Sequence, residues 1–411
     1  MSNKQTHDLP IREISSFKSD VLRMVTGTGI AQLIGIFAAP VLTRLYAPEA
    51  FGLATLFASL TLIIGVLACM RYELSIVLPE DDCDAANLFG VSLFSSLVIS
   101  LLTVPIVLIA APPIVRWIDL PDLEPYLWLL PFAILMHGVY TSLNYWNTRT
   151  KQFSSLSFVR VANQGIVTST NLGAGFAGFA TGGVMIAAGL AGRAGSIAIL
   201  GGQIWRENGR FLMQSIRWHK MLAGLKRYKK FPLYSSWSAL LNAVSWQLPA
   251  LMLGAFFSPA VVGFYALGVR ILQMPMNLIG NAVSQVFIQR AAVAKTDGTL
   301  AELVEGLFRR LVMVSLFPML ILAIIGRDLY VFLFGHNWAE AGVYAQILSV
   351  WAFFWFISSP LSQLFTVLER QELALKINSL LLVTRMLSLG IGGYQQSVYL
   401  ALFLYAGTGI L

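Results

Sequence analysis

The sequence predicts an all-α integral membrane protein, and three observations lead to this fold class. Of the 411 residues, 57% are hydrophobic and 12% are charged, and the mean hydropathy is +0.72. Apolar runs of about 20 residues, the length that crosses a bilayer as a helix, recur along the whole chain. The basic residues gather in alternate connections between these runs, which is typical of a multi-pass membrane protein.

Twelve apolar runs are candidates for transmembrane helices. The last run is too short to span a bilayer and ends in apolar sequence at Leu411, so we expect a truncated helix. Uncharged stretches of this length, with most charges near their ends, are the usual sign of a span. The predicted spans are 22–43, 52–70, 86–110, 125–147, 158–180, 183–204, 233–257, 263–289, 308–326, 343–367, 373–393 and 397–411.

The distribution of Lys and Arg predicts how these spans are oriented. With the N-terminus in the cytoplasm, 22 of the 28 basic residues fall in inner connections, three in outer connections and three within spans. This division follows the positive-inside rule. The net charge of +8 therefore reflects topology, and it favours anionic lipids at the inner face over nucleic acid as a partner.

A basic polar segment divides the twelve spans into six and six. The predicted parts are a cytoplasmic N-terminal segment (1–21), an N-lobe with spans 1–6 (22–204), a basic cytoplasmic linker (205–232) and a C-lobe with spans 7–12 (233–411). The linker carries eight of the inner basic residues. We therefore expect two six-helix bundles.

A short internal echo supports a repeat of the two halves. "APEAFG", with Pro48 and Gly52, recurs as "SPAVVG", with Pro259 and Gly263, at an offset of 211 residues. Six spans per repeat bring both copies in from the same side, so the repeats are predicted to be parallel around an axis along the membrane normal. A Pro-Gly turn between helices is common, and the echo gains weight mainly from its agreement with the linker.

Polar side chains within the spans mark candidate positions for a transport path. The longest stripe lies in span 8, with spacings of three and four that keep its members within roughly 60° of one another. Small polar residues also join helices together, which is the alternative explanation. The stripes are Arg270, Gln273, Asn277, Asn281 and Ser284 in span 8, Ser235, Ser238, Asn242 and Ser245 in span 7, and His137, Tyr140, Asn144 and Asn147 in span 4.

Five arginines are candidate binding residues. A charge in hydrocarbon costs at least roughly 2.5–3.5 kcal/mol unless it faces protein or water, so Arg270 is expected to face a lumen, with snorkelling as the alternative. Arg193 and Arg385 lie deep in spans 6 and 11 and are expected to face a cavity or a partner dipole. Arg23 and Arg71 lie at inner span ends, where they either anchor the helices or meet substrate.

Glu73, two residues after Arg71, is the acidic residue closest to a span core. Because residues two apart on a helix do not face each other, no ion pair between them is expected. None of the 20 acidic residues falls within a span core. The spans thus offer cationic and neutral donors, which suit an anionic substrate such as a diphosphate, and leave the identity of any coupling ion open.

Other chemistry is not predicted. Cys69 and Cys83 are placed near the inner face, where disulfides are disfavoured, and two cysteines with four scattered histidines offer no metal site. The sequence has no phosphate loop, no HExxH motif and no large outer loop for a catalytic site. No cofactor is expected, and the chain is predicted not to be an enzyme.

Four segments, in order, resemble the polysaccharide-transporter (Wzx-like) flippases of the MATE-like exporter superfamily. They are "RYELSIVLP" at 71–79, "SLNYWNTRTKQF" at 142–153, "FGHNWAEAG" at 334–342 and "SSPLSQLFTVLERQ" at 358–371. The resemblance extends from about residue 18 to the end. It implies two six-helix bundles around a central cavity, and an alternating-access cycle.

The resemblance also implies the cargo and the location. The cargo is an undecaprenyl-diphosphate-linked oligosaccharide, moved across the bacterial inner membrane for O-antigen, exopolysaccharide or capsule assembly. A polysaccharide polymerase and chain-length proteins are then expected partners. Two alternatives stay open: a small-molecule or drug exporter of the same fold, and a membrane-embedded polysaccharide polymerase or ligase.

Overall fold

The computed structural model describes residues 11–117 and 120–409. Within these residues, some side chains are not described: those of 11–25, 110–112, 114, 116–117, 277–278, 281–282 and 285. The described chain is almost entirely helical and contains no strand. The all-α prediction is therefore confirmed.

The N-terminal half consists of long helices joined by short connections. Its elements are α1 (Ile11–Leu45), α2 (Pro48–Gly65), the 3₁₀ helix η1 (Tyr72–Val77), α3 (Asp82–Trp117), η2 (Pro121–Leu123), α4 (Glu124–Leu127), α5 (Leu130–Arg149), α6 (Phe153–Phe176) and α7 (Gly182–Ser215). The short helix α8 (Trp218–Arg227) leads to the second half.

The C-terminal half has the same character but contains two π-helical turns. Its elements are the π turn η3 (Phe231–Ser235), α9 (Ser236–Phe256), α10 (Pro259–Pro275), the π turn η4 (Met276–Gly280), α11 (Asn281–Asp297), α12 (Leu300–Phe334), η5 (His336–Trp338), α13 (Ala339–Leu361), α14 (Leu364–Val367), α15 (Gln371–Tyr394) and α16 (Val398–Gly407).

Helix boundaries follow local sequence signals. Thr181 caps α7, Ser258 caps α10 and Ser397 caps α16, each through a side-chain oxygen that accepts from the backbone N–H three residues later. Gly298 ends α11 with a φ of 75°, a left-handed conformation that glycine adopts without strain.

A helix occupies each of the twelve predicted spans. Within the described residues, eight helical segments are long and apolar enough to cross a membrane, and nine if the bent pair Pro121–Leu127 and Leu130–Arg149, which meet at 54°, counts as one span. Three predicted spans do not meet this measure: α6, the α10–α11 pair and the short α16. The first contains polar residues within its length, and the second has a break between its two helices.

Two spans differ from the expected continuous helices. The span predicted at 52–70 ends as a helix at Gly65, and turns lead from there to η1. The span predicted at 263–289 consists of α10 and α11, with the π turn η4 between them. A π turn holds more residues than an α turn, so the helical phase changes at Met276. The stripe predicted for span 8 stays a prediction beyond that point, because the side chains of Asn277 and Asn281 lie outside the described residues.

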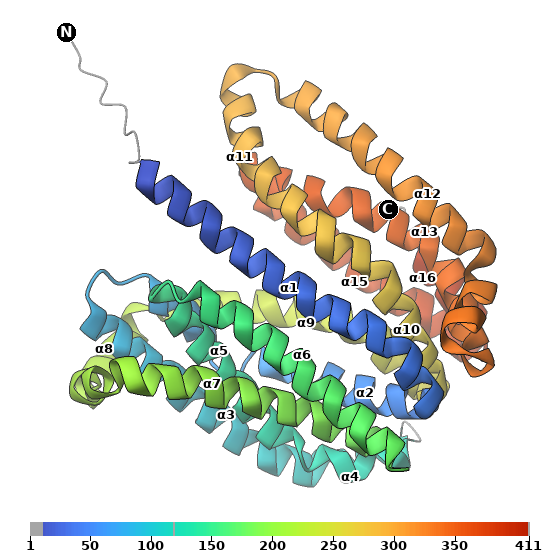
Figure 1. Cartoon of the computed structure of the whole chain (residues 1–411), viewed down its shortest axis with the longest axis horizontal. Helices are drawn as coiled ribbons and strands as arrows, with labels where there is room; N and C mark the ends of the chain where they lie inside the picture. The colour runs from blue at the N-terminus through green and yellow to red at the C-terminus, as the bar shows by residue number, and fades with distance from the viewer. Residues whose placement is uncertain (1–10, 118–119, 410–411) are drawn as a thin grey trace.

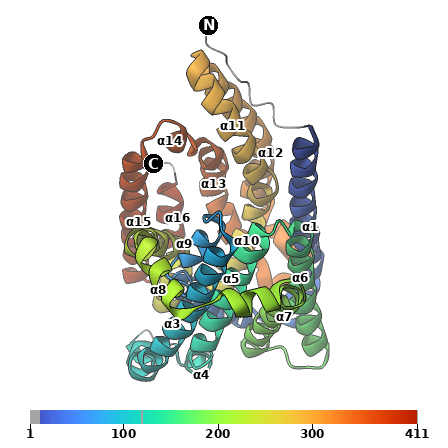
Figure 2. The same cartoon turned by 90° about the vertical axis from the view of Figure 1, so that its left-hand side faces the viewer.

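The two halves form two groups of helices. Figure 1 shows the N-terminal group with α3, α5, α6 and α7, and the C-terminal group with α12, α13, α15 and α16, while α1, α9 and α10 lie between them. Figure 2 shows the same division from the side, with α11 and α12 extending beyond the rest of the molecule. The proposed lobe boundaries in the sequence stay a prediction.

The residues of the sequence echo hold the two halves together. A Cβ on Gly52 would lie 1.7 Å from the carbonyl oxygen of Pro259, and a Cβ on Gly263 would lie 2.0 Å from that of Pro48. Only glycine allows the N-terminal turns of α2 and α10 to cross this closely. We name this reciprocal crossing the Pro-Gly contact; it lies at the end of α2 and α10 that is predicted to face outward.

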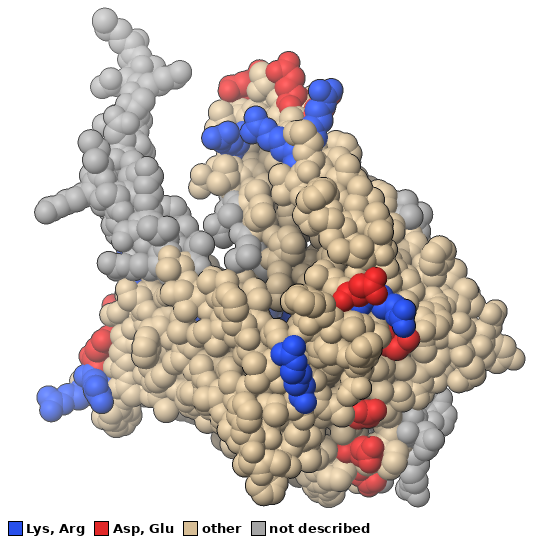
Figure 3. All heavy atoms as spheres, turned by 45° about the vertical axis from the view of Figure 1, so that its right-hand side comes forward, with Lys and Arg blue, Asp and Glu red and all other residues tan. Residues whose placement is uncertain are grey.

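The surface is apolar between the charged ends. Figure 3 shows a broad uncharged surface between the charged side chains at the top of the molecule and those at its lower right. Several large apolar side chains on α12 point outward, and Phe317, Ile324 and Phe332 are 71%, 73% and 79% exposed. Such a belt is expected where lipid covers the protein.

Candidate functional pocket

A pocket of about 270 Å³ lies between the two groups of helices. Its described lining comes from α1, α6 and α10, and contains three amides or hydroxyls and two arginines; no carboxylate is among these described residues. The lining residues are Thr28, Ala31, Gln32, Gly35, Ile36, Arg160, Gln164, Arg270 and Met274. Two of these helices, α6 and α10, are the ones too polar or too short to pass as apolar spans.

Arg270 enters this pocket from α10, across the interface between the groups. Its Nη2 donates to the carbonyl oxygen of Gly35 on α1, at 3.4 Å. A Cβ on Gly35 would lie 2.7 Å from that nitrogen, so the glycine leaves the space that the guanidinium occupies. The side chain is nevertheless exposed, because it faces the open pocket.

Arg160 supplies a second guanidinium from α6, on the other side of the pocket. Its Nη1 donates to Oγ1 of Thr28 on α1, at 2.6 Å. Neither Arg160 nor Arg270 forms an ion pair with an acidic side chain among the described residues. Among the described residues, the pocket therefore carries positive charge from α6 and α10 without an acidic partner.

Polar atoms without partners complete the pocket. Oε1 of Gln32 is buried and has no hydrogen-bond partner among the described residues. Nε2 of Gln164 donates to Oγ1 of Thr168, at 3.0 Å, which fixes the amide beside the pocket. A buried acceptor without a partner is costly, so Gln32 is suited to receive a donor from a ligand.

The other candidates of span 8 do not extend this site within the described residues. Gln273 is partly buried on α10 but does not line the pocket, whereas Met274 does. The side chains of Asn277, Asn281 and Arg23 lie outside the described residues. Their predicted roles stay predictions.

Arg193 and His137 meet inside the N-terminal group. The guanidinium of Arg193, on α7, lies 4.4 Å from the ring centroid of Tyr140 on α5, a cation–π contact. His137 lies near Arg193, and packs beside Gly65 at the end of α2. These residues form a cluster separate from the pocket lining, to which Asn144, partly buried on α5, also does not contribute.

Arg385 is buried in the C-terminal group and is 8% exposed. Its Nη1 donates to the Ser245 Oγ, at 3.0 Å, and to the Ser245 carbonyl, at 3.4 Å, on α9. The rings of Trp246 and Tyr405 lie 5.8 Å from the guanidinium. Arg385 thus meets a partner dipole and aromatic faces, whereas Asn242 is exposed on α9.

Arg71 and Glu73 form an ion pair, contrary to the expectation from helix geometry. Nη1 of Arg71 lies 3.4 Å from Oε1 of Glu73. The expectation was wrong because the helix ends at Gly65, and Met70 and Arg71 have φ values of 51° and 61°. Glu73 is 3% exposed, and burial raises its pKa while Arg71 opposes that shift.

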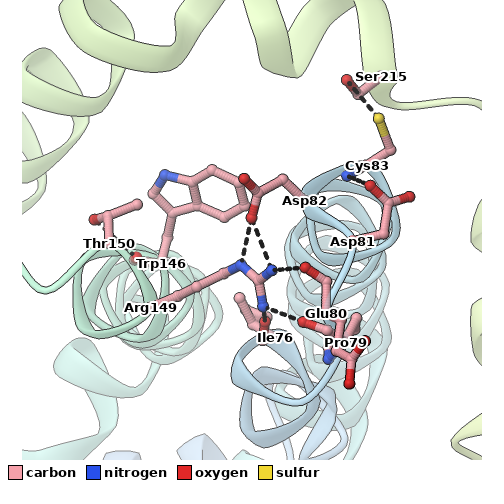
Figure 4. Close-up of polar contacts among 10 residues, drawn as sticks. All are labelled: Ile76, Pro79, Glu80, Asp81, Asp82, Cys83, Trp146, Arg149, Thr150 and Ser215. Atoms are coloured by element: carbon pink, nitrogen blue, oxygen red, sulfur yellow. Dashed lines mark hydrogen bonds and ion pairs between the residues drawn. The ribbon is translucent and has the colours of Figure 1, made fainter.

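Arg149 joins two of the four segments that carry the family resemblance (Figure 4). Its Nη1 donates to the carbonyls of Ile76, at 3.1 Å, and Pro79, at 2.7 Å. Its Nε and Nη2 donate to one carboxylate oxygen of Asp82, at 3.1 and 2.7 Å. Arg149 therefore fixes the inner end of α5 to η1 and to the start of α3, and we name these contacts the Arg149 clamp.

Sequence reasoning missed Arg160, Gln164, Gln32 and Thr28 as pocket residues. Arg160 was counted among the inner anchors because it precedes most of its apolar run. A signal was present: Arg160, Gln164 and Thr168 recur every four residues, which places them on one face of α6. The partner helix for that face was not accessible from one sequence.

The comparison with protein families decides the identity at family level. The family described as "Polysaccharide biosynthesis protein" matches residues 41–343, more than half of the chain. The chain belongs to this family. The match contains the Pro-Gly contact, the linker and both pocket arginines, and a comparison with curated proteins finds no match.

Solved structures show the fold of this family member. "Lipid II flippase MurJ, inward closed conformation" aligns with a TM-score of 0.69 and 11% identity, over 94% of this chain and 84% of that one. An inward-facing multidrug resistance MATE family transporter of the MOP superfamily aligns with a TM-score of 0.63 and 13% identity, over 93% of this chain and 90% of that one.

A third structure has the same fold. A MOP superfamily transporter from Pyrococcus furiosus aligns with a TM-score of 0.57 and 14% identity, over 96% of this chain and 92% of that one. The chain is therefore a multi-pass membrane protein with the MATE-like fold. The resemblance that the sequence motifs indicated is confirmed at family and fold level.

Proposed function

We propose that this protein is a flippase that moves a polyprenyl-diphosphate-linked oligosaccharide from the inner to the outer leaflet of the bacterial inner membrane. The carrier lipid is undecaprenyl, and the product serves O-antigen, exopolysaccharide or capsule assembly. One observation carries this proposal: the pocket between the two groups of helices holds Arg160 and Arg270 from opposite sides and no carboxylate. The chain acts as a transporter without a cofactor, and not as an enzyme.

The two arginines suit a diphosphate. Guanidinium groups bind phosphate oxygens through paired N–H donors, and the interaction strengthens where water is scarce. Each charge-assisted hydrogen bond contributes roughly 1.5–3 kcal/mol, which is about tenfold or more in affinity. The amides of Gln32 and Gln164 and the hydroxyl of Thr28 then face the sugars that follow the diphosphate.

An alternating-access cycle fits the positions of the pocket and the Pro-Gly contact. The pocket is lined by α1, α6 and α10. The Pro-Gly contact joins the N-terminal turns of α2 and α10, at the end predicted to face outward. Release to the outer leaflet then requires this contact to separate. The polyprenyl tail stays in lipid through the gap between the lobes, while the polar head crosses.

The assignment of Arg270 is tested by export of surface glycan in a null strain. Arg270→Ala removes the charge and is expected to abolish export while the protein stays in the membrane at a normal level. Arg270→Lys keeps the positive charge but loses the paired N–H donors of the guanidinium, and is expected to export weakly. Arg310→Ala, at an exposed position on α12, is the matched control and is expected to export normally. Normal export by Arg270→Ala contradicts the assignment.

The leaflet in which lipid-linked repeats accumulate separates this proposal from its alternatives. Loss of a flippase leaves them in the inner leaflet. Loss of a polymerase or ligase leaves unpolymerised repeats in the outer leaflet, and that result rules the flippase out. The MATE-like neighbours favour a small-molecule exporter as second candidate, which predicts drug sensitivity in a null strain with intact surface glycan.

Further parts of the proposal concern topology and partners. The N-terminus lies in the cytoplasm, as the distribution of basic residues predicts. A polysaccharide polymerase and chain-length proteins act on the translocated repeats. A coupling ion, if one is used, has no carboxylate in the pocket lining to bind it.

A further inference from the structure

The helix α8, between the two groups of helices, is attached to the N-terminal group along one side. Its Met221 is buried together with Tyr72 and Val91. The hydroxyl of Tyr72 donates to the carbonyl of Leu225, at 3.2 Å. Asn87, on α3, accepts from the backbone N–H of Arg217 at 2.8 Å. The helix therefore has a fixed position on α3.

The contacts of α8 lie along the first part of α3. They extend from Leu88, beside Gly224, to Phe94, which meets the ring of Trp218 at 5.4 Å. At 1.5 Å per residue, these contacts begin about 9 Å and end about 18 Å from Asp82 along α3. With Asp82 at the predicted inner surface and a headgroup layer of roughly 5–8 Å, α8 is expected to lie near the boundary between headgroups and acyl chains.

A second flank of α8 is apolar and largely exposed, apart from the contact between Trp218 and Phe94. Trp218 and Leu222, one turn apart, are 58% and 41% exposed. Beyond Trp218, the exposed apolar surface continues on α3 with Phe94 and Leu101. Trp237, in the first turn of α9, is also exposed. Exposed apolar side chains of this size are expected to face lipid.

The next flank is basic. Lys226 and Arg227 end α8, and Lys229 and Lys230 follow, all four of them exposed. Among the described residues, only Arg227 of these four has an acidic partner, Asp84, at 3.8 Å. Lys226 lies one turn after Leu222, so the basic residues continue the apolar flank along the helix toward its C-terminal end.

We propose that α8 is a docking surface for anionic phospholipid of the inner leaflet. Trp218 and Leu222 insert among the acyl chains, and the four basic residues bind the lipid phosphates. An amphipathic helix with these two flanks binds at the interface through its apolar area and through attraction to anionic lipid. Because the apolar flank adjoins exposed apolar residues of the predicted membrane span α3, a bilayer covers it, whereas an acidic soluble protein reaches only the basic flank.

The experiment measures equilibrium binding of phosphatidylglycerol and phosphatidylcholine to the purified full-length protein. Each Lys or Arg near an anionic surface strengthens attraction by about fivefold. Lys229→Gln with Lys230→Gln is therefore expected to weaken phosphatidylglycerol binding by about 25-fold, and to leave phosphatidylcholine binding unchanged. Arg309→Gln with Arg310→Gln, on the exposed start of α12, is the matched control and is expected to have little effect.

A depth measurement tests the apolar flank independently. A nitroxide at position 222, in the protein reconstituted with phosphatidylglycerol, is expected to contact oxygen dissolved in the membrane and to be shielded from a water-soluble relaxation agent. The proposal is overturned if the α8 double variant binds phosphatidylglycerol normally, or if the control variant loses as much. A water-exposed nitroxide at 222 also overturns it, and indicates a soluble partner for the basic flank. Glycan export is scored separately, so loss of lipid binding with normal export leaves the proposed function intact.

Discussion

The Pro-Gly contact leads to a prediction about the conformational cycle. Replacing Gly263 with alanine adds a single methyl group at the crossing of α2 and α10. The methyl carbon would lie 2.0 Å from the carbonyl oxygen of Pro48, and side-chain carbons essentially never approach an atom closer than 3.0 Å. The two helices therefore have to separate by about 1 Å before the crossing can form.

The energy of this separation follows from the atoms involved. The obstacle is a backbone carbonyl, which cannot rotate away as a flexible side chain does. Overpacking by a methyl group costs roughly 1–3 kcal/mol in a packed interior. A cost of this size, paid only in the state with the contact closed, changes the ratio of closed to open molecules by about 5- to 150-fold. Gly263→Ala is expected to favour the outward-open state.

The assay is a distance measurement between nitroxides at positions 49 and 260, which directly follow Pro48 and Pro259. Cys69 and Cys83 are first replaced by serine, and this background has to keep glycan export. Wild type is expected to give a short distance, and Gly263→Ala a broader distribution with a longer component. Gly165→Ala is the control, because a Cβ there meets no atom within 4 Å.

Two outcomes test the reasoning directly. If Gly263→Ala and wild type give the same distances, the closeness of the crossing has no role in the cycle. If Gly165→Ala gives the same long component, the change comes from general weakening of the helices. Gly52→Ala is expected to act in the same direction, and to add little to Gly263→Ala, because both methyl groups enter one contact.

Three further predictions concern the inner end of the N-terminal group. Arg149→Lys removes the several guanidinium hydrogen bonds of the Arg149 clamp, so it is expected to lower the free energy of unfolding by roughly 2–3 kcal/mol. Thermal unfolding measures this change, and Arg309→Lys is the control, with little effect expected. If both variants are equally stable, the Arg149 clamp does not stabilise the protein. Because burial raises the pKa of Glu73 above its ordinary 4.5, the folded state binds this proton more tightly than the unfolded one. The free energy of unfolding of the wild type should therefore fall as the pH rises above 4.5, and that of Glu73→Gln should depend less on pH. If the two proteins have parallel profiles of stability against pH, the predicted role of Glu73 is wrong. A water-soluble maleimide is expected to label Cys83 and to spare the buried Cys69, which mass spectrometry of labelled peptides reports.

Much of the fold follows from patterns within single helices. The length of the apolar runs and the position of basic residues predicted a helix at twelve places, and the structure has a helix at each of them. The pattern is reliable because a span has to satisfy its own backbone hydrogen bonds in lipid. The interruptions did not follow from the pattern. The helix of α2 stops at Gly65 although apolar residues continue to Met70, and the π turn at Met276 occurs inside a sequence with ordinary helical spacing.

The site was predictable only in part, because it is built between helices. Arg270 stood out, since an arginine in an apolar run needs a special environment. Its neighbour Arg160 did not, because a basic residue near a span end is ordinary. Arg193 and Arg385 were equally conspicuous in sequence, yet they lie against aromatic rings outside the pocket lining. Which arginine within a span lines the pocket depends on which helices pack together.

The reciprocal form of the Pro-Gly contact has a consequence for how the chain can vary. Residue 52 meets residue 259 while residue 263 meets residue 48, which is the isologous arrangement of a two-fold dimer written within one polypeptide. Each half thus contributes one glycine and one proline carbonyl to the crossing. Because a side chain at residue 52 or 263 would meet a backbone carbonyl of the other half, no substitution on the opposite side relieves the clash, and glycine is expected to be required on both sides of the pseudo-symmetry axis.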